Sequence, residues 1–237
     1  MPDFDAAFYF DLASPLAYMA AERVLQTMPI ATEWQPVLAN ELPGHESFAA
    51  FRCREEQDIF RLELERRADE LGLQRMRWPD PFPFDSAFAM RAATYAKSIG
   101  RIVAFAQAAF RQAYAGGHPL DVPDNVMIAA AACEMHPSAV LKGAELRSIA
   151  EQLSAATSAA AALGVEDVPA VRIGEHVFHG ERALEDAATH ARRGALPRNE
   201  RDQARHERDQ RRHQPGTDDA ATVAAGIAAK VARRSAL

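Results

Sequence analysis

Cysteine is scarce in this sequence, which has Cys53 and Cys133 and no others among its 237 residues. Neither belongs to a Cys-x-x-Cys pair or to a spacing typical of metal ligands, so the sequence predicts no redox dithiol and no metal site built on sulfur. Two isolated cysteines are typical of a protein kept reduced in a cytoplasm, and not of a disulfide-stapled secreted domain.

Long hydrophobic runs and a surplus of positive charge are also missing. No apolar run approaches the roughly 20 residues that a membrane-spanning helix needs. The start of the chain, Met1–Asp5, lacks the basic and apolar regions of a signal peptide. The net charge of −6 gives no reason to expect nucleic acid or an anionic membrane as a partner. These absences predict a cytoplasmic protein that binds neither.

Apolar periodicity begins with a strand–helix–strand unit. Residues 6–12 and 31–38 are predicted as strands, and residues 15–28 between them as a helix that Pro29 ends. From about residue 40 to residue 163 the pattern becomes helical throughout. The first helix is expected to bury Leu16, Met19, Ala20, Val24 and Leu25.

The helical middle segment carries three apolar stripes at helical spacing, and strands resume after it. Gly164 stands where a glycine ends the last helix. Strands are predicted at 170–173 and 176–179, joined by Gly174-Glu175 as a type II′ hairpin, with a closing helix at 181–192. The stripes are Phe60, Leu64, Ala68 and Leu71; Ile102, Phe105, Ala106, Ala109, Phe110 and Ala113; and Leu146, Ile149, Leu153, Ala156, Ala160 and Leu163.

Three sequence blocks carry a resemblance to a known family: FYFDLASPLAY at 8–18, RWPDPFPFDSAFAMRAATYA at 77–96 and ATSAAAALGVEDVPAVRIGEHVFHGERAL at 156–184. Between about residues 8 and 188 the chain resembles the DsbA-like thioredoxin superfamily, in its branch of 2-hydroxychromene-2-carboxylate isomerases and kappa-class glutathione transferases. The resemblance implies an α/β fold: a thioredoxin-like core, residues 6–38 plus 164–193, split by an all-helical insertion at 40–163.

Ser14 stands where the redox relatives have their first cysteine, and Ala17 where they have the second, so this chain cannot shuttle a disulfide there. Serine followed by Pro15 is also an ordinary helix start, which leaves a purely structural role open. At a helix N-terminus, a hydroxyl among unpaired N–H groups favours a bound thiolate. The resemblance implies that this serine hydrogen-bonds the sulfur of glutathione, as the catalytic residue.

Val168-Pro169 opens the third strand, which proline tolerates. The resemblance implies a cis peptide that faces Ser14 and pairs with the backbone of a glutathione-like thiol. Where relatives have a Trp-Gly-x-Asp-Arg turn, this chain has Arg182 at the aspartate position, and their Gly-Asn-x-Pro loop is replaced by residues 39–44. Arg182 is therefore either a ligand for a carboxylate of another thiol or substrate, or an exposed charge in a first helical turn.

The loop over residues 78–84 is stiffened by three prolines and carries Trp78 and Phe82. It is suited to wall a pocket for an aromatic substrate, and its alternative role is to pack the insertion against the core. Arg91 is a weaker candidate for binding a substrate carboxylate. No metal is expected, because His176 and His179 are three apart on a strand and point to opposite faces.

The function that these residues favour is a thiol-dependent isomerase of the 2-hydroxychromene-2-carboxylate type, acting on an aromatic acid with glutathione or another low-molecular-weight thiol. The alternatives are a kappa-type transferase, which would release the thiol adduct, an oxidoreductase-like member of the DsbA family, and a non-catalytic thioredoxin-fold binding protein. The expected partners are the thiol and the aromatic substrate, without nucleic acid or membrane, and a homodimer stays open.

Residues 196–237 have a different composition, with charges of both signs and almost no apolar residue before His213. Such a segment cannot bury a core, so we predict a charged, disordered tail. Deleting the residues after Leu196 is expected to leave the melting temperature nearly unchanged. Thermal melts of the full and shortened chains, followed by circular dichroism, test this; a large drop on truncation would show that the tail packs on the core.

Overall fold

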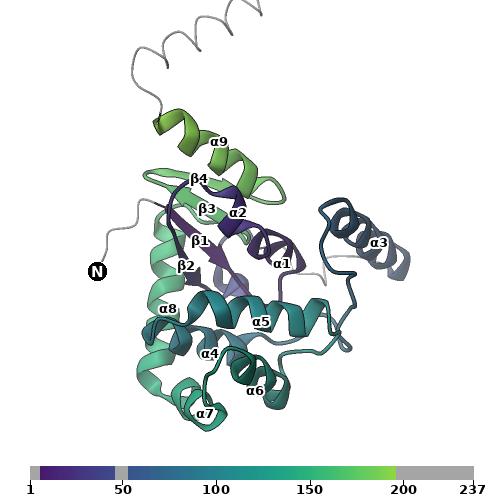
Figure 1. The fold of residues 1–237 in the computed structure, drawn as a ribbon, viewed down its shortest axis with the longest axis vertical. Helices are drawn as coiled ribbons and strands as arrows, with labels where there is room; N and C mark the ends of the chain where they lie inside the picture. The colour runs from purple at the N-terminus through teal and green to yellow at the C-terminus, as the bar shows by residue number, and fades with distance from the viewer. Residues whose placement is uncertain (1–5, 46–52, 196–237) are drawn as a thin grey trace, which may run out of the picture. The chain divides into compact units, whose positions relative to one another are not determined.

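The computed structural model describes residues 6–45 and 53–195, centred on a four-stranded sheet with the order β2-β1-β3-β4 (Figure 1). β1 (Ala6–Phe10) pairs parallel with β2 (Thr32–Pro36) and antiparallel with β3 (Ala170–Ile173). β3 in turn pairs antiparallel with β4 (His176–His179). Strands from the two ends of the described chain therefore form one sheet, with a long helical segment between them in sequence.

Helices surround this sheet, and most of them lie between β2 and β3 in sequence. Figure 1 shows α4–α7 grouped beyond the carboxyl end of β1, with α3 to the side of this group. The helices are α1 (Pro15–Ala21), α2 (Val24–Thr27), α3 (Arg54–Glu70), α4 (Ala87–Ser98), α5 (Ile102–Tyr114), α6 (Pro123–Ala132), α7 (Pro137–Glu145), α8 (Arg147–Ala162) and α9 (Ala183–Ala195), with a 3-10 turn η1 at Ala39–Glu41.

β1 is buried along its whole length because both faces of the sheet are covered. Phe8 and Phe10 face one side, where each packs edge-on against Trp34 with ring centroids 5.1 and 5.8 Å apart. Tyr9 points to the other side, into a second apolar cluster that includes Ala160 of α8. This alternation explains why the strand is apolar at every position, as a doubly covered strand must be.

The fold class predicted from the sequence is confirmed: a thioredoxin-like α/β core with a helical insertion. The strands at 170–173 and 176–179 have the predicted bounds, and Gly174 has a φ of 55° as the first residue of the hairpin turn. Gly164, with a φ of 88°, ends α8 as predicted. The domain boundaries stay predictions, and the tail at 196–237 lies outside the described residues.

The single helix predicted over 15–28 is wrong, because the chain breaks after α1 and restarts as α2. Glu22 and Arg23 stand at the break and are held by ion pairs to Arg111 and Glu185. Leu25 follows this break and is 62% exposed, although it was expected to be buried. Both partners are far away in sequence, so local periodicity carries no signal of them.

The three predicted apolar stripes all face the core, except at their ends. Leu64 and Ala68 of α3 are buried, as are Phe105 and Phe110 of α5. In the α8 stripe, the expected burial of the two terminal leucines is wrong. Leu146 and Leu163 are each 52% exposed, because they flank the helix instead of facing its packed side.

A close contact between α4 and α7 depends on Gly143. A Cβ built there would lie 2.4–2.6 Å from the ring of Tyr95, which is well inside van der Waals contact. Gly143→Ala is therefore expected to lower the free energy of unfolding by roughly 1–3 kcal/mol, because overpacking outweighs the gain in helix propensity. Urea denaturation measures the change.

Gly194→Ala on α9 is the matched control, since no atom of the described residues lies within 4 Å of its added Cβ. Replacing a helical glycine by alanine without such a clash is expected to raise the free energy of unfolding by about 0.5–1 kcal/mol. Equal effects of the two substitutions would mean that the α4–α7 contact yields without cost.

Candidate functional site

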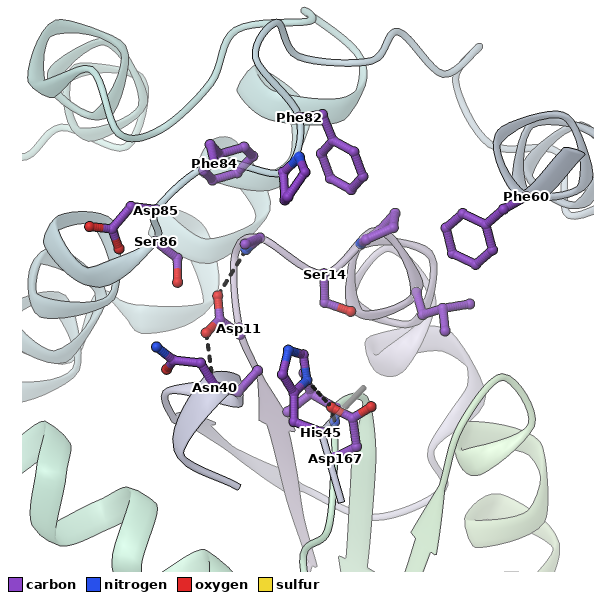
Figure 2. A pocket seen from close by; sticks show the side chains of 16 residues that line it. Asp11, Ser14, Asn40, His45, Phe60, Phe82, Phe84, Asp85, Ser86 and Asp167 are labelled. Atoms are coloured by element: carbon purple, nitrogen blue, oxygen red, sulfur yellow. Dashed lines mark hydrogen bonds and ion pairs between the residues drawn. The ribbon is translucent and has the colours of Figure 1, made fainter. Parts of the chain in front are cut away.

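A cavity of about 490 Å³ opens at the carboxyl end of β1. Its walls come from four segments that are far apart in sequence: the β1–α1 turn, the loop after β2, α3 with the loop before α4, and the loop before β3. Figure 2 shows the side chains of these segments gathered around the same space, Ser14, His45, Phe82 and Asp167 among them. The cavity therefore lies between the core and the helical insertion.

Ser14 lines this cavity and is the N-cap of α1. Its Oγ accepts a hydrogen bond from the N–H of Ala17 at 3.1 Å, and its own N–H donates to the carbonyl of Asp11 at 3.0 Å. A hydroxyl that accepts in this way keeps its proton for a second partner. The capping interpretation of Ser14 and a donor role toward a ligand are therefore compatible in one geometry.

Asp11 is buried beside Ser14, with 2% of its surface exposed. One carboxylate oxygen accepts from the N–H of Ala13 and the other from the N–H of Ala39, both at 2.9 Å. Burial raises the pKa of Asp11 above its ordinary value, although these two N–H groups, the Ser86 side chain and the charge of His45 lower it. The sequence analysis gave Asp11 no role; a charged residue ending a buried strand was the available signal.

Three phenylalanines form the apolar wall: Phe60 of α3, with Phe82 and Phe84 of the loop before α4. Trp78 does not line the cavity. It packs edge-on behind Phe82, with ring centroids 4.9 Å apart, and donates its Nε1–H to Glu65 at 2.7 Å. Phe82 thus faces the cavity, whereas Trp78 packs the loop against α3; binding of an aromatic substrate by this loop stays a prediction.

The peptide between Val168 and Pro169 is cis, as predicted, and Val168 lines the cavity. Two further cis peptides, Asp80-Pro81 and Phe82-Pro83, were not anticipated. The N–H of Val168 donates to the carboxylate of Asp167 at 2.8 Å. Pairing of a ligand backbone with Val168, expected from the resemblance, would have to displace this bond or use the carbonyl alone.

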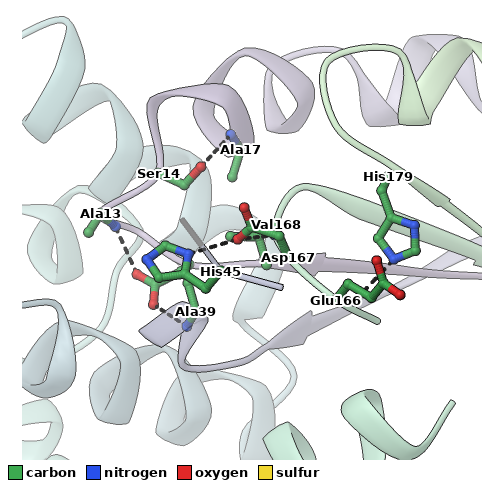
Figure 3. A network of polar contacts seen from close by, with 10 residues as sticks. Ala13, Ser14, Ala17, Ala39, His45, Glu166, Asp167, Val168 and His179 are labelled. Atoms are coloured by element: carbon green, nitrogen blue, oxygen red, sulfur yellow. Dashed lines mark hydrogen bonds and ion pairs between the residues drawn. The ribbon is translucent and has the colours of Figure 1, made fainter. Parts of the chain in front are cut away.

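A histidine–aspartate pair lies across the cavity from the aromatic wall, and the sequence analysis did not find it. His45 Nδ1 is 2.8 Å from a carboxylate oxygen of Asp167 (Figure 3). The two loops meet because Gly44 donates its N–H to the carbonyl of Glu166 at 2.9 Å, and a Cβ on Gly44 would be 2.9 Å from that of Glu166.

The two arginines proposed from the sequence lie outside the cavity lining. Arg182 is three-quarters exposed and pairs with Asp186, one turn further along, at 3.8 Å. Arg91 is half-buried on α4, with its Nε buried and without a hydrogen-bond partner among the described residues. Their roles toward a carboxylate stay predictions.

Cys53 is exposed and Cys133 is buried, and neither lines the cavity. Within residues 6–45 and 53–195, no three histidine, cysteine or acidic side chains gather closely enough to hold a metal ion. His176 stacks on His190, whereas His179 accepts a hydrogen bond from the N–H of Glu166 at 3.2 Å, so the two strand histidines have separate surroundings. In the described part of the chain, no helix is long and apolar enough to cross a membrane.

The sequence profile of the DSBA-like thioredoxin domain matches residues 7–191. Among solved structures, the fold is similar to a 2-hydroxychromene-2-carboxylate isomerase, with a TM-score of 0.68 and 19% identity over 79% of this chain and 94% of that one. A probable DsbA oxidoreductase from Streptomyces coelicolor is similar, with a TM-score of 0.68 and 19% identity over 81% of this chain and 91% of that one.

A cytosolic disulfide reductase, DsbM from Pseudomonas aeruginosa, was solved with GSH and is also similar, with a TM-score of 0.56 and 12% identity over 79% of this chain and 96% of that one. These identities show a shared fold. No protein among those with curated functions matches the sequence.

Asp11→Asn is expected to lower the free energy of unfolding by about 1–3 kcal/mol, because one amide oxygen cannot accept from both Ala13 and Ala39. The folded pKa of Asp11 lies above its unfolded value. The contribution of Asp11 to stability is therefore full below the unfolded pKa and is lost as pH rises through the folded pKa. The deficit of the variant is thus expected to be largest at acid pH and to shrink toward neutrality.

Urea denaturation of the unchanged protein and of Asp11→Asn, from acid to neutral pH, measures the difference in their free energies of unfolding. A deficit that does not change with pH would show that Asp11 titrates alike in the folded and unfolded chains.

Proposed function

The chain belongs to the DSBA-like thioredoxin domain family, and on that premise we propose that it is an isomerase of the 2-hydroxychromene-2-carboxylate type. It uses a low-molecular-weight thiol such as glutathione and acts on an aromatic acid. The observation that carries this proposal is Ser14, a hydroxyl with a free proton, in a cavity walled by three phenylalanines and lined by no cysteine among the described residues.

The thiol chemistry of this family needs a sulfur atom, and the described residues of the cavity lining supply none. A small thiol bound against the Ser14 turn would supply it. The Ser14 hydroxyl donates its proton to the sulfur while its oxygen stays bonded to the N–H of Ala17. A hydrogen bond to a charged acceptor is stronger than one to a neutral group, so this donor favours the thiolate over the thiol.

The reaction is an addition followed by its reversal after rotation. The thiolate forms a carbon–sulfur bond to an unsaturated carbon of the substrate, and the double-bond electron pair moves onto the conjugated carbonyl. The former double bond is now single and rotates. The electron pair then returns, the carbon–sulfur bond breaks, and the thiolate is recovered, so atoms and electrons balance. A kappa-type transferase would release the adduct, and product analysis distinguishes the two.

The walls of the cavity suit an aromatic substrate. Phe82 and Phe84 lie on one side with Ser14 facing them, and Phe60 lies apart, on the side of α3. Aromatic side chains favour edge-on or offset contact with another ring, which would leave the reactive carbon of the substrate directed toward the thiol. A reaction that consumes no thiol but needs it reduced is suited to a cytoplasm, where small thiols stay reduced.

One observation favours a non-catalytic binding protein instead, namely the cap that Ser14 makes to Ala17. Substitution of Ser14 separates the two functions. If Ser14 were only a cap, Ser14→Gly would be nearly silent and Ser14→Ala would cost about 1 kcal/mol of stability.

If Ser14 holds a thiolate, both substitutions are expected to raise the pKa of the bound thiol alike and to slow isomerisation about ten- to a hundredfold. The measurements are ultraviolet titration of thiolate in the presence of glutathione, and turnover of a hydroxychromene carboxylate. Identical titration curves for all three proteins would reduce Ser14 to a helix cap.

A further inference from the structure

His45 is the one basic side chain among the described residues that line the cavity. The charged side chains around it are carboxylates, namely Asp11, Asp85 and Asp167. A thiolate formed in this space would face negative charge on several sides, which disfavours it strongly in a partly enclosed site. The N-terminus of α1 at Ser14 favours an anion in part, and a positive charge that arises together with the anion would favour it further; His45 is the lining side chain that can provide one.

The hydrogen bond to Asp167 determines which imidazole nitrogen is free. A carboxylate only accepts hydrogen bonds, so the 2.8 Å contact makes His45 Nδ1 the protonated nitrogen. Nε2 is then left with a lone pair that can take a proton. The side chains of His45 and Asp167 are 28% and 39% exposed, so a ligand in the cavity can reach them.

The pair is held in place from both sides. Asp167 also accepts the N–H of Val168 at 2.8 Å, which orients the carboxylate. The loop that carries His45 is tied to the same segment through the Gly44–Glu166 hydrogen bond of 2.9 Å. Figures 2 and 3 both show the imidazole beside the Ser14 turn, with Asp167 next to it. This is the arrangement of a base whose tautomer is set by a carboxylate.

We propose that His45 is the base that takes the proton from the bound thiol, and that Asp167 is the positioning residue that holds its imidazole. This deepens the proposed function and rests on it. Nε2 of His45 accepts the proton of the S–H bond, and the electron pair of that bond remains on sulfur. The imidazolium, paired with Asp167, then faces the thiolate that Ser14 also contacts. The same proton returns to the sulfur when the thiol leaves.

The first test follows the proton of glutathione. Calorimetry at neutral pH in buffers of different ionisation heat, with ultraviolet detection of thiolate, is expected to show thiolate on binding without proton release to the buffer. His45→Gln keeps a hydrogen bond to Asp167 but accepts no proton, so the titration of the bound thiol is expected to move back toward its ordinary range, near pH 8.5. Isomerase turnover is expected to fall about a hundredfold or more.

His118→Gln is the matched control, because His118 is exposed and does not line the cavity. It is expected to behave as the unchanged protein in every measurement. If His45→Gln leaves the thiolate titration and the proton count unchanged, the assignment of His45 is overturned while the proposed function stands. If the unchanged protein forms no complex with glutathione or cysteamine and has no thiol-dependent turnover, the proposed function is overturned.

The second test measures which imidazole nitrogen of His45 carries the proton, and it needs no ligand. Long-range proton–nitrogen NMR spectra, with His45 assigned by its loss in His45→Gln, are expected to show a proton on Nδ1 and none on Nε2. A proton on Nε2 would overturn the base assignment whatever the protein binds.

Asp167→Asn tests positioning. The hydrogen bond from Nδ1 to the carboxylate fixes the tautomer, so the variant is expected to show the His45 proton shared between Nδ1 and Nε2 in the nitrogen spectra and to lose turnover. An unchanged tautomer with unchanged turnover would show that Asp167 does not position the base.

Discussion

The buried carboxylate of Asp11 is the interaction on which the rest of the site depends. It follows the central strand directly and binds the N–H groups of Ala13 and Ala39 through its two oxygens. The Ser86 side chain at the start of α4 also acts on this carboxyl, lowering its pKa. The β1–α1 turn, the loop after β2 and the helical insertion are thus joined at one charged group, and each of them supplies a wall of the cavity.

This arrangement has an energetic cost that hydrogen bonding offsets in part. Burial raises the pKa of Asp11, so the folded chain holds this carboxyl closer to neutrality than water would. Tyr114 of α5 reinforces the same turn by donating its hydroxyl to the carbonyl of Ala13 at 2.6 Å. A buried charge with too few hydrogen bonds lowers the stability of the fold. One whose hydrogen bonds are made fixes the backbone groups that donate to it. The position of Ser14, three residues on, follows from that rigidity.

The chemistry proposed for the cavity follows from what its walls lack as much as from what they hold. Because the described lining residues include no cysteine, lysine or arginine, the proposed chemistry takes its sulfur from a ligand, and His45 is the lining side chain that can add positive charge to that of the α1 N-terminus. In the proposed reaction the phenylalanines of the insertion offer a surface for an aromatic ring, and the polar groups come from both the core, with Ser14 and Asp167, and the insertion, with His45. The proposal therefore assigns ring recognition to the phenylalanines and proton transfer to His45, across the cavity from Phe82 and Phe84.

The sequence by itself determined the strands, the hairpin at Gly174, the helix end at Gly164 and the Ser14 turn, because each depends on neighbours a few residues away. Only the tertiary structure decided which side chains meet in the cavity. Asp11 and Ala39 are 28 residues apart, and His45 and Asp167 are 122 apart, so no local pattern links them. The break between α1 and α2 has the same origin, since ion pairs with distant helices overrode a continuous helical periodicity.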